Sequence, residues 1–325
     1  MGSDQVTNSV ASGCTDGLKR AGPSVTAVVL NWNGREPLLR TFAALYRSRY
    51  PFEELLLVDN GSSDGSVEAV QAAFPEVTVL AQEHNLGPGT GRNVGIRRAM
   101  ASRADYIFNV DNDIEVFPET VRTLIETADQ RPDIGVVGPM MYFRDRMNVI
   151  QNVGGQVRFR QNVVYPIGWL EPDHGQFNEP LKVDMVGSAA MLTRREVFEQ
   201  VGYFDEGYIG YGLEDTDFCT KVRRSGWKVI CNPQAKVRHD FRFNHKYTYR
   251  RKYLEARNAV FYLRKYGSRS DWAKFIFFSL GGLPYAFVRE VLHGNVGGVI
   301  GKAQGLFDAL VRREGRAVEV FRSQE

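Results

Sequence analysis

The sequence has few cysteines and little net charge, and each shortage excludes a class of protein. Its 325 residues contain only Cys14, Cys219 and Cys231, which lack the paired spacing of a metal site and an even disulfide framework. We therefore expect a reducing, cytoplasmic compartment, with Cys219 and Cys231 as buried thiols. A net charge of +3 is too small to indicate a nucleic-acid-binding protein by itself.

Long apolar runs are also missing. The most apolar stretch, residues 275–288, is interrupted by Pro284 and is shorter than the roughly 20 residues that a membrane-spanning helix requires. An interfacial helix pair, a dimer contact and a core contact remain open alternatives for it. The glycines of residues 294–301 then predict a flexible or closely packed link to an amphipathic last helix, residues 303–311.

The glycine loops of the commonest nucleotide folds are absent. The predicted first strand, residues 25–30, ends in Asn31-Trp32-Asn33-Gly34, not in the glycine fingerprint of a dinucleotide-binding fold. The later glycines of residues 87–91 fail the same spacing, because position 92 is arginine. A nucleotide would therefore not be held on a glycine-rich helix start.

What is present is a regular alternation of short strands and helices. Further strands are predicted at 54–58, 77–80 and just before 109, and helices at 36–46, 66–74 and up to residue 100. Short connections between such elements are typical of an α/β fold with a mostly parallel central sheet and helices on both faces.

Two acids follow the strand that ends at Phe108. Asp111 and Asp113 flank Asn112, and carboxylates at the carboxyl end of a strand point into the crevice where open α/β sheets bind ligands. Such a pair suits a hard divalent cation shared with a diphosphate. The alternative is a polar turn in which Asp113 caps the following segment.

Two other polar residues belong to this predicted edge. Asp59 ends the second strand, where its carboxylate can accept hydrogen bonds from a base or a ribose, although a tight turn is the alternative. Arg92 begins a helix and would suit a diphosphate, but in isolation it is more typical of a solvated helix surface.

The second half predicts a strand at 134–140, loops or short antiparallel strands over 142–181, a strand at 183–192 and a helix at 194–201. Gly187-Ser188 indicates a bulge or a close approach of a ligand. A helix is predicted from about Thr216 to Gly226, with Asp215 as its N-cap, as a general base, or as both.

Two strands, 228–231 and 235–239, follow. His239 ends the second and is either structural or a further ligand to a metal held by Asp113. Residues 236–266 hold ten Lys or Arg among aromatics. We do not expect this stretch to bind nucleic acid, because Tyr253, Arg257 and Phe261 share one helix face, a spacing typical of packing. A further interpretation is that its basic face binds the phosphate of a lipid-linked acceptor or an anionic membrane.

Five segments in order resemble the motifs of family 2 glycosyltransferases with the GT-A fold, closest to the rhamnosyltransferase and galactofuranosyltransferase subgroup. They are residues 28–33, 58–66, 85–95, 111–113 and 214–226. Five ordered motifs are far more specific than one. Asn112 departs from the third acid or proline of many relatives, which leaves the donor open.

The resemblance implies an inverting, metal-dependent enzyme that uses a nucleotide-diphosphate sugar. Asp215 would be the general base, with Glu214 positioning the acceptor, and Mn²⁺ or Mg²⁺ would be held by Asp113 with Asp111 and, more weakly, His239. The residues that it implies for the nucleotide sugar are Asn31, Asn33, Asp59, Arg92, Asp111, Asn112 and Gly187.

The acceptor would be a glycan, a lipid-linked molecule or a small molecule. We expect a disordered tail over 1–23, a glycosyltransferase domain over 24–267, with a nucleotide-binding half at 24–115 and an acceptor half at 116–267, and a C-terminal helical region over 268–325. The C-terminal helical region could form a homodimer contact, and the protein could contact a membrane peripherally. A nucleotidyltransferase of the same fold and a non-catalytic sugar-binding relative are the alternative functions.

Overall fold

The computed structural model describes residues 22–146, 148–160, 162–210, 212–241, 249–292 and 296–322. Apart from its last two residues, the predicted tail lies outside these ranges, as does Cys14. Cys219 and Cys231 are buried thiols, as predicted.

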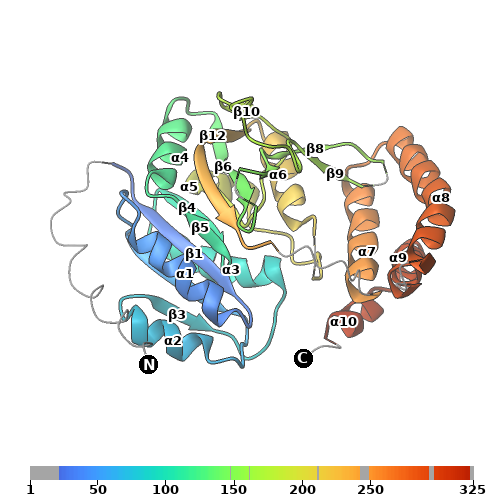
Figure 1. Cartoon of the computed structure of the whole chain (residues 1–325), viewed down its shortest axis with the longest axis horizontal. Coiled ribbons are helices and arrows are strands. Elements are labelled where there is room, and N and C mark those ends of the chain that lie inside the picture. The colour runs from blue at the N-terminus through green and yellow to red at the C-terminus, as the bar shows by residue number, and fades with distance from the viewer. Residues whose placement is uncertain are drawn as a thin grey trace, which may run out of the picture.

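A ten-stranded mixed sheet forms the centre of the protein (Figure 1), in the order β10-β12-β6-β11-β4-β1-β2-β3, with β5 beside β12 and β7 beside β6. The strands β1 to β4 are parallel, and β11 runs antiparallel between β4 and β6. The sheet strands are β1 (Val25–Asn31), β2 (Glu54–Asp59), β3 (Thr78–Ala81), β4 (Tyr106–Asp111), β5 (Ile114–Val116), β6 (Ile134–Phe143), β7 (Ile150–Asn152), β10 (Leu181–Lys182), β11 (Ala190–Arg194) and β12 (Lys228–His239). A separate hairpin joins β8 (Gly155–Val157) to β9 (Val164–Pro166).

Helices cover both faces of the sheet, as the alternation of elements predicts. Side chains alternate along β1, so Val29 faces one apolar core and Val28 the other. The first core includes residues of α1 (Arg35–Tyr46), α2 (Ser66–Ala73) and α4 (Thr120–Asp129). The second core includes residues of α3 (Pro88–Ala101), α5 (Arg195–Val201) and α6 (Glu214–Arg224).

Four helices form the C-terminal extension, to the right of the sheet in Figure 1: α7 (Tyr249–Tyr266), α8 (Arg269–Leu292), α9 (Val296–Leu310) and α10 (Glu314–Arg322). A Cβ added at Gly301 would lie 2.2 Å from the carbonyl oxygen of Tyr249, and one at Gly305 would lie 2.3 Å from that of Tyr253. The backbones of α7 and α9 therefore touch, so the glycines serve close packing.

The extension differs from the sequence-based expectation in two respects. Pro284 does not interrupt α8, which is continuous from Arg269 to Leu292, since a proline removes one helical hydrogen bond and leaves the others. The helix predicted to be last begins earlier, at Val296, and α10 follows it.

Two strand predictions are also corrected. Strand β11 begins at Ala190 instead of 183, because Val183 and Met185 bond to other segments, Val183 N to the carbonyl of Val229 and Met185 to Gly155. The strands predicted at 228–231 and 235–239 form one strand, β12, with an irregularity between Asn232 and Lys236.

The predicted face of α7 is confirmed as packing, because Tyr253 and Arg257 are buried. Part of the basic stretch, residues 242–248, lies outside the described residues. Among the described helices, none is both long enough and apolar enough to cross a membrane.

Candidate functional site

The predicted polar residues meet at one edge of the sheet. Parallel pairing places Asn31 of β1 opposite Asp59 of β2, and Leu30 opposite Asp111 of β4. Most residues of the three strands are buried, and each strand ends in a polar residue, Asn31, Asp59 or Asp111, of which the first two are buried as well. The common strand direction therefore brings residues from three separate motifs together.

Asp59 is the centre of a hydrogen-bonded group at this edge. Its Oδ1 accepts from Asn31 Nδ2 at 2.8 Å and from Ser62 Oγ at 2.7 Å, and its Oδ2 accepts from Ser62 N at 2.8 Å. Asn112 Nδ2 in turn donates to Asn31 Oδ1 at 2.6 Å. A carboxylate has about four acceptor positions, so Asp59 retains capacity for one further donor.

The turn after β1 is shaped by Asn33 and Gly34. Asn33 has a φ of 49°, a left-handed conformation that asparagine adopts more readily than most residues, and its Oδ1 accepts from Ser63 N at 2.8 Å. A Cβ at Gly34 would lie 2.1 Å from Asn112 Nδ2. Glycine is therefore required for the two polar loops to approach each other.

Arg92 joins the sheet edge to α6. Its guanidinium is buried, with one nitrogen 2.5 Å from Asp111 Oδ1 and another 3.3 Å from Glu214 Oε1. Burial alone would lower the pKa of Arg92, but the charges of Asp111 and Glu214 outweigh it and raise the pKa. Arg92 is thus not the solvated arginine of the sequence alternative, and in this arrangement its charge is matched by two carboxylates.

If Asp215 were the N-cap, α6 would begin at Thr216, but it begins two residues earlier. Glu214 is its first residue, and Leu213 precedes it with a φ of 75°. The N-cap prediction for Asp215 is therefore wrong, because the left-handed Leu213 already starts the turn. Both acids lie in the first turn, where the helix dipole favours negative charge.

Asp215 lies beside the predicted Gly187-Ser188. Its Oδ1 accepts from Thr216 N at 2.6 Å, and the backbone of Ser188 also hydrogen-bonds to it. A Cβ at Gly187 would lie 3.9 Å from Asp215 Oδ2 and 3.8 Å from Met141 Cε. Gly187 lies in the turn before β11 and not within a strand, and an atom at its Cβ position would be in ordinary van der Waals contact with this carboxylate.

The two acids of α6 hold their protons more tightly than free carboxylates. Burial and the neighbouring Asp215 raise the pKa of Glu214 to about 7, although Arg92 opposes this. Burial also raises the pKa of Asp215 above its ordinary value, against the hydrogen bonds from Thr216 and the charge of Arg92. Carboxyl pKa values raised in this way are typical of acids that take part in proton transfer.

His239 and Asp113 form the other end of the site. His239 lies opposite Ile114 in the pairing of β12 with β5, and its Nε2 is 3.3 Å from Asp113 Oδ2. Its Nδ1 is 2.9 Å from Gln151 Oε1. Burial lowers the pKa of His239, but the hydrogen bond and charge of Asp113 outweigh it and raise the pKa.

The donor set of this end fits a divalent cation with few protein ligands. Asp113 supplies carboxylate oxygens, His239 an imidazole nitrogen oriented by Gln151, and Asp111 has a second oxygen besides the one that contacts Arg92. The described residues contain no group of three or more His, Cys, Asp or Glu arranged as a complete metal site. A cation here would need ligands from a substrate and water, as Mg²⁺ commonly does.

Contacts connect the two ends of the site. Asp111 is joined through Arg92 to Glu214, the neighbour of Asp215. On the other side, His239 contacts Gln151 of β7, and its neighbour Asn152 donates to Met141 Sδ at 3.5 Å. The Met141 methyl group would lie 3.8 Å from a Cβ at Gly187. Side-chain contacts and chain neighbours thus link the part of the site that holds Asp113 to the part that holds Asp215.

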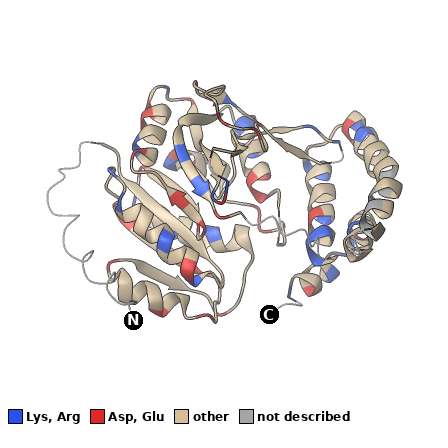
Figure 2. Ribbon diagram, in the orientation of Figure 1, with Lys and Arg blue, Asp and Glu red and all other residues tan. Residues whose placement is uncertain are grey.

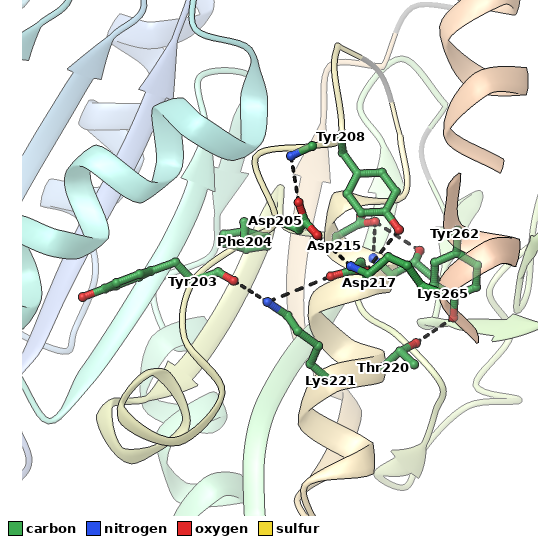
Figure 3. Close-up of polar contacts among 12 residues, drawn as sticks. Tyr203, Phe204, Asp205, Tyr208, Asp215, Asp217, Thr220, Lys221, Tyr262 and Lys265 are labelled. Atoms are coloured by element: carbon green, nitrogen blue, oxygen red, sulfur yellow. Dashed lines mark hydrogen bonds and ion pairs between the residues drawn. The ribbon is translucent and has the colours of Figure 1, made fainter. Parts of the chain in front are cut away.

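A buried ionic cluster lies behind Asp215 (Figure 3). Asp217 is fully buried, and its Oδ1 accepts from Tyr208 at 3.1 Å, from Tyr266 at 2.9 Å and from Lys265. Lys265 also lies 2.7 Å from Asp205 Oδ2. Because Lys265 and Tyr266 belong to α7, this cluster fixes α6 to the C-terminal extension.

Sequence reasoning missed several of these residues. Gln151 and Asp217 have no motif of their own, and their partners lie far away in the sequence. Asp240, which bonds to Arg40 at 2.8 Å and to Arg144 at 3.2 Å, was likewise not singled out. The chain offered one signal, the acidic run of residues 214–217, in which Asp217 is the third acid.

Comparison with known families gives two matches. The model described as glycosyl transferase family 2 matches residues 26–202, and the model described as N-terminal domain of galactosyltransferase matches residues 175–246. The first match spans more than half of the chain.

Two curated relatives are similar to part of the chain. An N-acetylglucosaminyl-diphospho-decaprenol L-rhamnosyltransferase of Mycobacterium tuberculosis is 29% identical over 57% of this chain and 66% of its own length. The O-antigen biosynthesis protein RfbC of Myxococcus xanthus is 29% identical over 68% of this chain but only 17% of its own length. The chain thus spans less than two thirds of either relative.

Solved structures share the fold at low identity. GalNAc-T7, in a structure with UDP, GalNAc and Mn²⁺, has a TM-score of 0.57 at 17% identity, covering 84% of this chain and 59% of that one. TarS of S. aureus has a TM-score of 0.56 at 16% identity, covering 90% of this chain and 83% of that one. The mannosyltransferase PcManGT of Pyrobaculum calidifontis, in complex with GDP-Man and Mn²⁺, has a TM-score of 0.54 at 16% identity, covering 92% of this chain and 81% of that one. The predicted GT-A architecture is thereby confirmed.

Proposed function

Because the chain belongs to glycosyl transferase family 2, we propose that it moves a sugar from a nucleotide-diphosphate donor to an acceptor hydroxyl, with inversion at the anomeric carbon. The observation that carries the proposal is the buried bridge from Asp111 through Arg92 to Glu214. It couples the strand edge where a diphosphate would bind to the helix that holds Asp215.

The nucleotide would lie over the carboxyl ends of β1 and β2. Asp59 retains an acceptor position for a base or ribose donor, and the turn at Asn33 holds the adjoining loop in place. Asn31 and Asn112 connect this part of the site to Asp111. Their role would be to orient the donor, because both side chains are held by hydrogen bonds before it arrives.

Asp113, with His239 and Asp111, would hold Mn²⁺ or Mg²⁺. When bound, the cation supplies Lewis-acid stabilisation of charge on the leaving diphosphate. Arg92 would act as a positioning residue, because its two carboxylate partners keep its guanidinium within the protein.

Asp215 would take the proton from the attacking hydroxyl. Its raised pKa makes it a stronger base than a free aspartate, and Gly187 leaves space for an acceptor beside Oδ2. Glu214 would position the acceptor and tune the basicity of Asp215. One catalytic carboxylate is sufficient for this reaction, unlike the paired acids of glycoside hydrolases.

The name of the mycobacterial relative supports a lipid-linked acceptor, although a glycan or small molecule fits the same chemistry. The cytoplasmic location, membrane contact and homodimer remain proposals about the whole protein. The family match favours glycosyl transfer over the nucleotidyltransferase and binding-only alternatives.

The test is release of nucleoside diphosphate from a panel of nucleotide sugars, with Mn²⁺ and with EDTA. We expect Asp215→Asn to lower turnover roughly 10²–10⁴-fold, the usual contribution of a general base. Glu126→Gln, on the exposed side of α4, is the control and should not change it. Undiminished turnover in Asp215→Asn, or activity that ignores EDTA, would contradict the proposal.

A further inference from the structure

The packing of α9 is the reverse of that in an ordinary surface helix. Its buried positions are small or polar, namely Gly298, Gly301, Gly305, Asp308 and Ala309. Several of its large apolar side chains are exposed instead: Ile300 is 52% exposed, Phe307 55% and Leu310 54%, and Val311 just beyond the helix is 48% exposed.

The same reversal occurs in α8. Phe275 and Ser279 are buried, whereas Phe277 is 73% exposed, Tyr285 70%, Val288 58% and Leu292 79%. At about 100° per residue these four exposed side chains lie on one side of the helix. Figure 2 shows charged residues in the first turns of α8, and its sequence holds no Lys, Arg, Asp or Glu between Lys274 and Arg289.

Exposure of this kind is concentrated in one part of the protein. Among the large hydrophobic residues exposed in the described ranges, all except Trp169 and Leu170 lie at position 276 or later. Each such side chain gains about 1.5–3 kcal/mol on full burial, so a contiguous exposed set indicates a surface with a partner.

The margin of this apolar surface is basic. A hollow between α7 and the end of α9 is lined by Arg257, Arg264, Arg312 and Arg313, together with Phe261, Asp308 and Ala309. A guanidinium nitrogen of Arg264 lies 3.1 Å from the carbonyl oxygen of Leu310, and the guanidinium of Arg313 is 5.8 Å from the ring of Phe307. Positive charge and exposed apolar side chains are therefore adjacent.

Three arginines at this margin are available to bind an anionic partner. Arg264, Arg312 and Arg313 are exposed, and within the part of the chain that the structure describes none of them makes an ion pair. Asp308, the acid of α9, is buried and lies 3.6 Å from Arg316.

We propose that the exposed faces of α8 and α9, with Arg264, Arg312 and Arg313, dock this protein on the surface of an anionic lipid bilayer. Apolar side chains would enter the interfacial region while the arginines meet lipid phosphates, as in interfacial helices. A second copy of the chain is less suited, because a symmetric contact would add a second set of arginines without acids of α9 to balance them. The proposal does not rest on glycosyl transfer.

The experiment is co-sedimentation of the full chain with vesicles of phosphatidylcholine alone and of phosphatidylcholine containing phosphatidylglycerol. We expect binding to the anionic vesicles that weakens with added salt. Arg312→Gln/Arg313→Gln should weaken it roughly 30-fold, since each basic residue near an anionic surface contributes about 1 kcal/mol. Phe307→Ser/Leu310→Ser should weaken binding while leaving the salt dependence in place.

The matched control is Arg47→Gln/Arg103→Gln, which removes two exposed arginines from the sheet-containing part. It should bind as the parent does, and all variants should keep the parental melting temperature. The proposal would be overturned if the parent does not bind anionic vesicles at low salt, or if the control variant loses as much binding as Arg312→Gln/Arg313→Gln. It would also be overturned if the parent does not bind vesicles but forms a dimer that Phe307→Ser/Leu310→Ser dissociates.

Discussion

His239 Nε2 lies 3.3 Å from Asp113 Oδ2, although one residue ends β12 and the other follows β4. Gln151 holds the second ring nitrogen, so the imidazole is oriented toward the carboxylate. If the pair holds a cation, Gln151→Ala should raise the Mn²⁺ concentration needed for half-maximal donor turnover roughly 10–100-fold, the usual effect of losing an orienting partner. His239→Ala should raise it further.

Direct Mn²⁺ binding, followed by electron paramagnetic resonance with donor present, separates this effect from a loss of chemistry. His84→Ala, an exposed histidine, is the control. Unchanged Mn²⁺ affinity in His239→Ala would remove this residue from the metal site.

The acid pair of α6 predicts how turnover depends on pH. Asp215 works as a base only when deprotonated, and its pKa is raised while that of its coupled neighbour Glu214 is about 7. Turnover should therefore fall as the pH drops through the raised pKa of Asp215, at a higher pH than for a free aspartate. Glu214→Gln removes a like charge, so the acidic limb of the rate profile should move to lower pH. A profile that stays in place in Glu214→Gln would show that the two acids do not titrate together.

The cluster around Asp217 predicts a stability effect. Lys265→Met removes the nearest cation from a fully buried carboxylate and leaves it with two tyrosine hydroxyls and Lys221, whose Nζ is 4.0 Å away. We expect this to cost about 3 kcal/mol in the free energy of unfolding. Lys265→Met/Asp217→Asn should recover part of it. Lys274→Met, which breaks the exposed pair with Asp271, should cost less than about 1 kcal/mol in the same urea titration. Equal losses of unfolding free energy in Lys265→Met and Lys274→Met would mean that the buried ion pair stabilises the protein no more than the exposed one.

The close backbone contact of α7 with α9 can be tested by substituting two glycines of α9, one at the contact and one away from it. Gly301→Ala would place a Cβ 2.2 Å from the backbone of Tyr249, and we expect a loss of about 1–3 kcal/mol from overpacking. The nearest atom to a Cβ at Gly297 is 4.0 Å away, so Gly297→Ala should be neutral or stabilising by up to about 1 kcal/mol through helix propensity. Thermal unfolding measures both, and a tolerant Gly301→Ala would contradict the backbone contact.

Local patterns were sufficient to predict the strand-end residues. Asn31, Asp59 and Asp111 each follow an apolar run, and parallel strands bring such ends together. Partners across the chain were not predictable in this way. The link of Arg92 to Glu214 and that of His239 to Gln151 depend on how distant elements pack.

One helix boundary and two glycines within a helix illustrate the same limit of sequence-based prediction. Asp215 is a favoured N-cap residue, yet the left-handed Leu213 starts α6 earlier, which capping preferences do not reveal. Gly301 and Gly305 look like helix breakers in the sequence, but the backbone of α7 requires their small size.

The helix α7 touches α9 at Tyr249 and Tyr253 and reaches Asp217 of α6 through Lys265. With 18 residues at about 1.5 Å each, it is a rigid spacer of about 27 Å. If α9 rests on a bilayer, the reacting group at Asp215 is held at one constant height above the lipid headgroups. The reach of an acceptor, measured from its anchor to its free hydroxyl, would then decide which molecules this enzyme can extend.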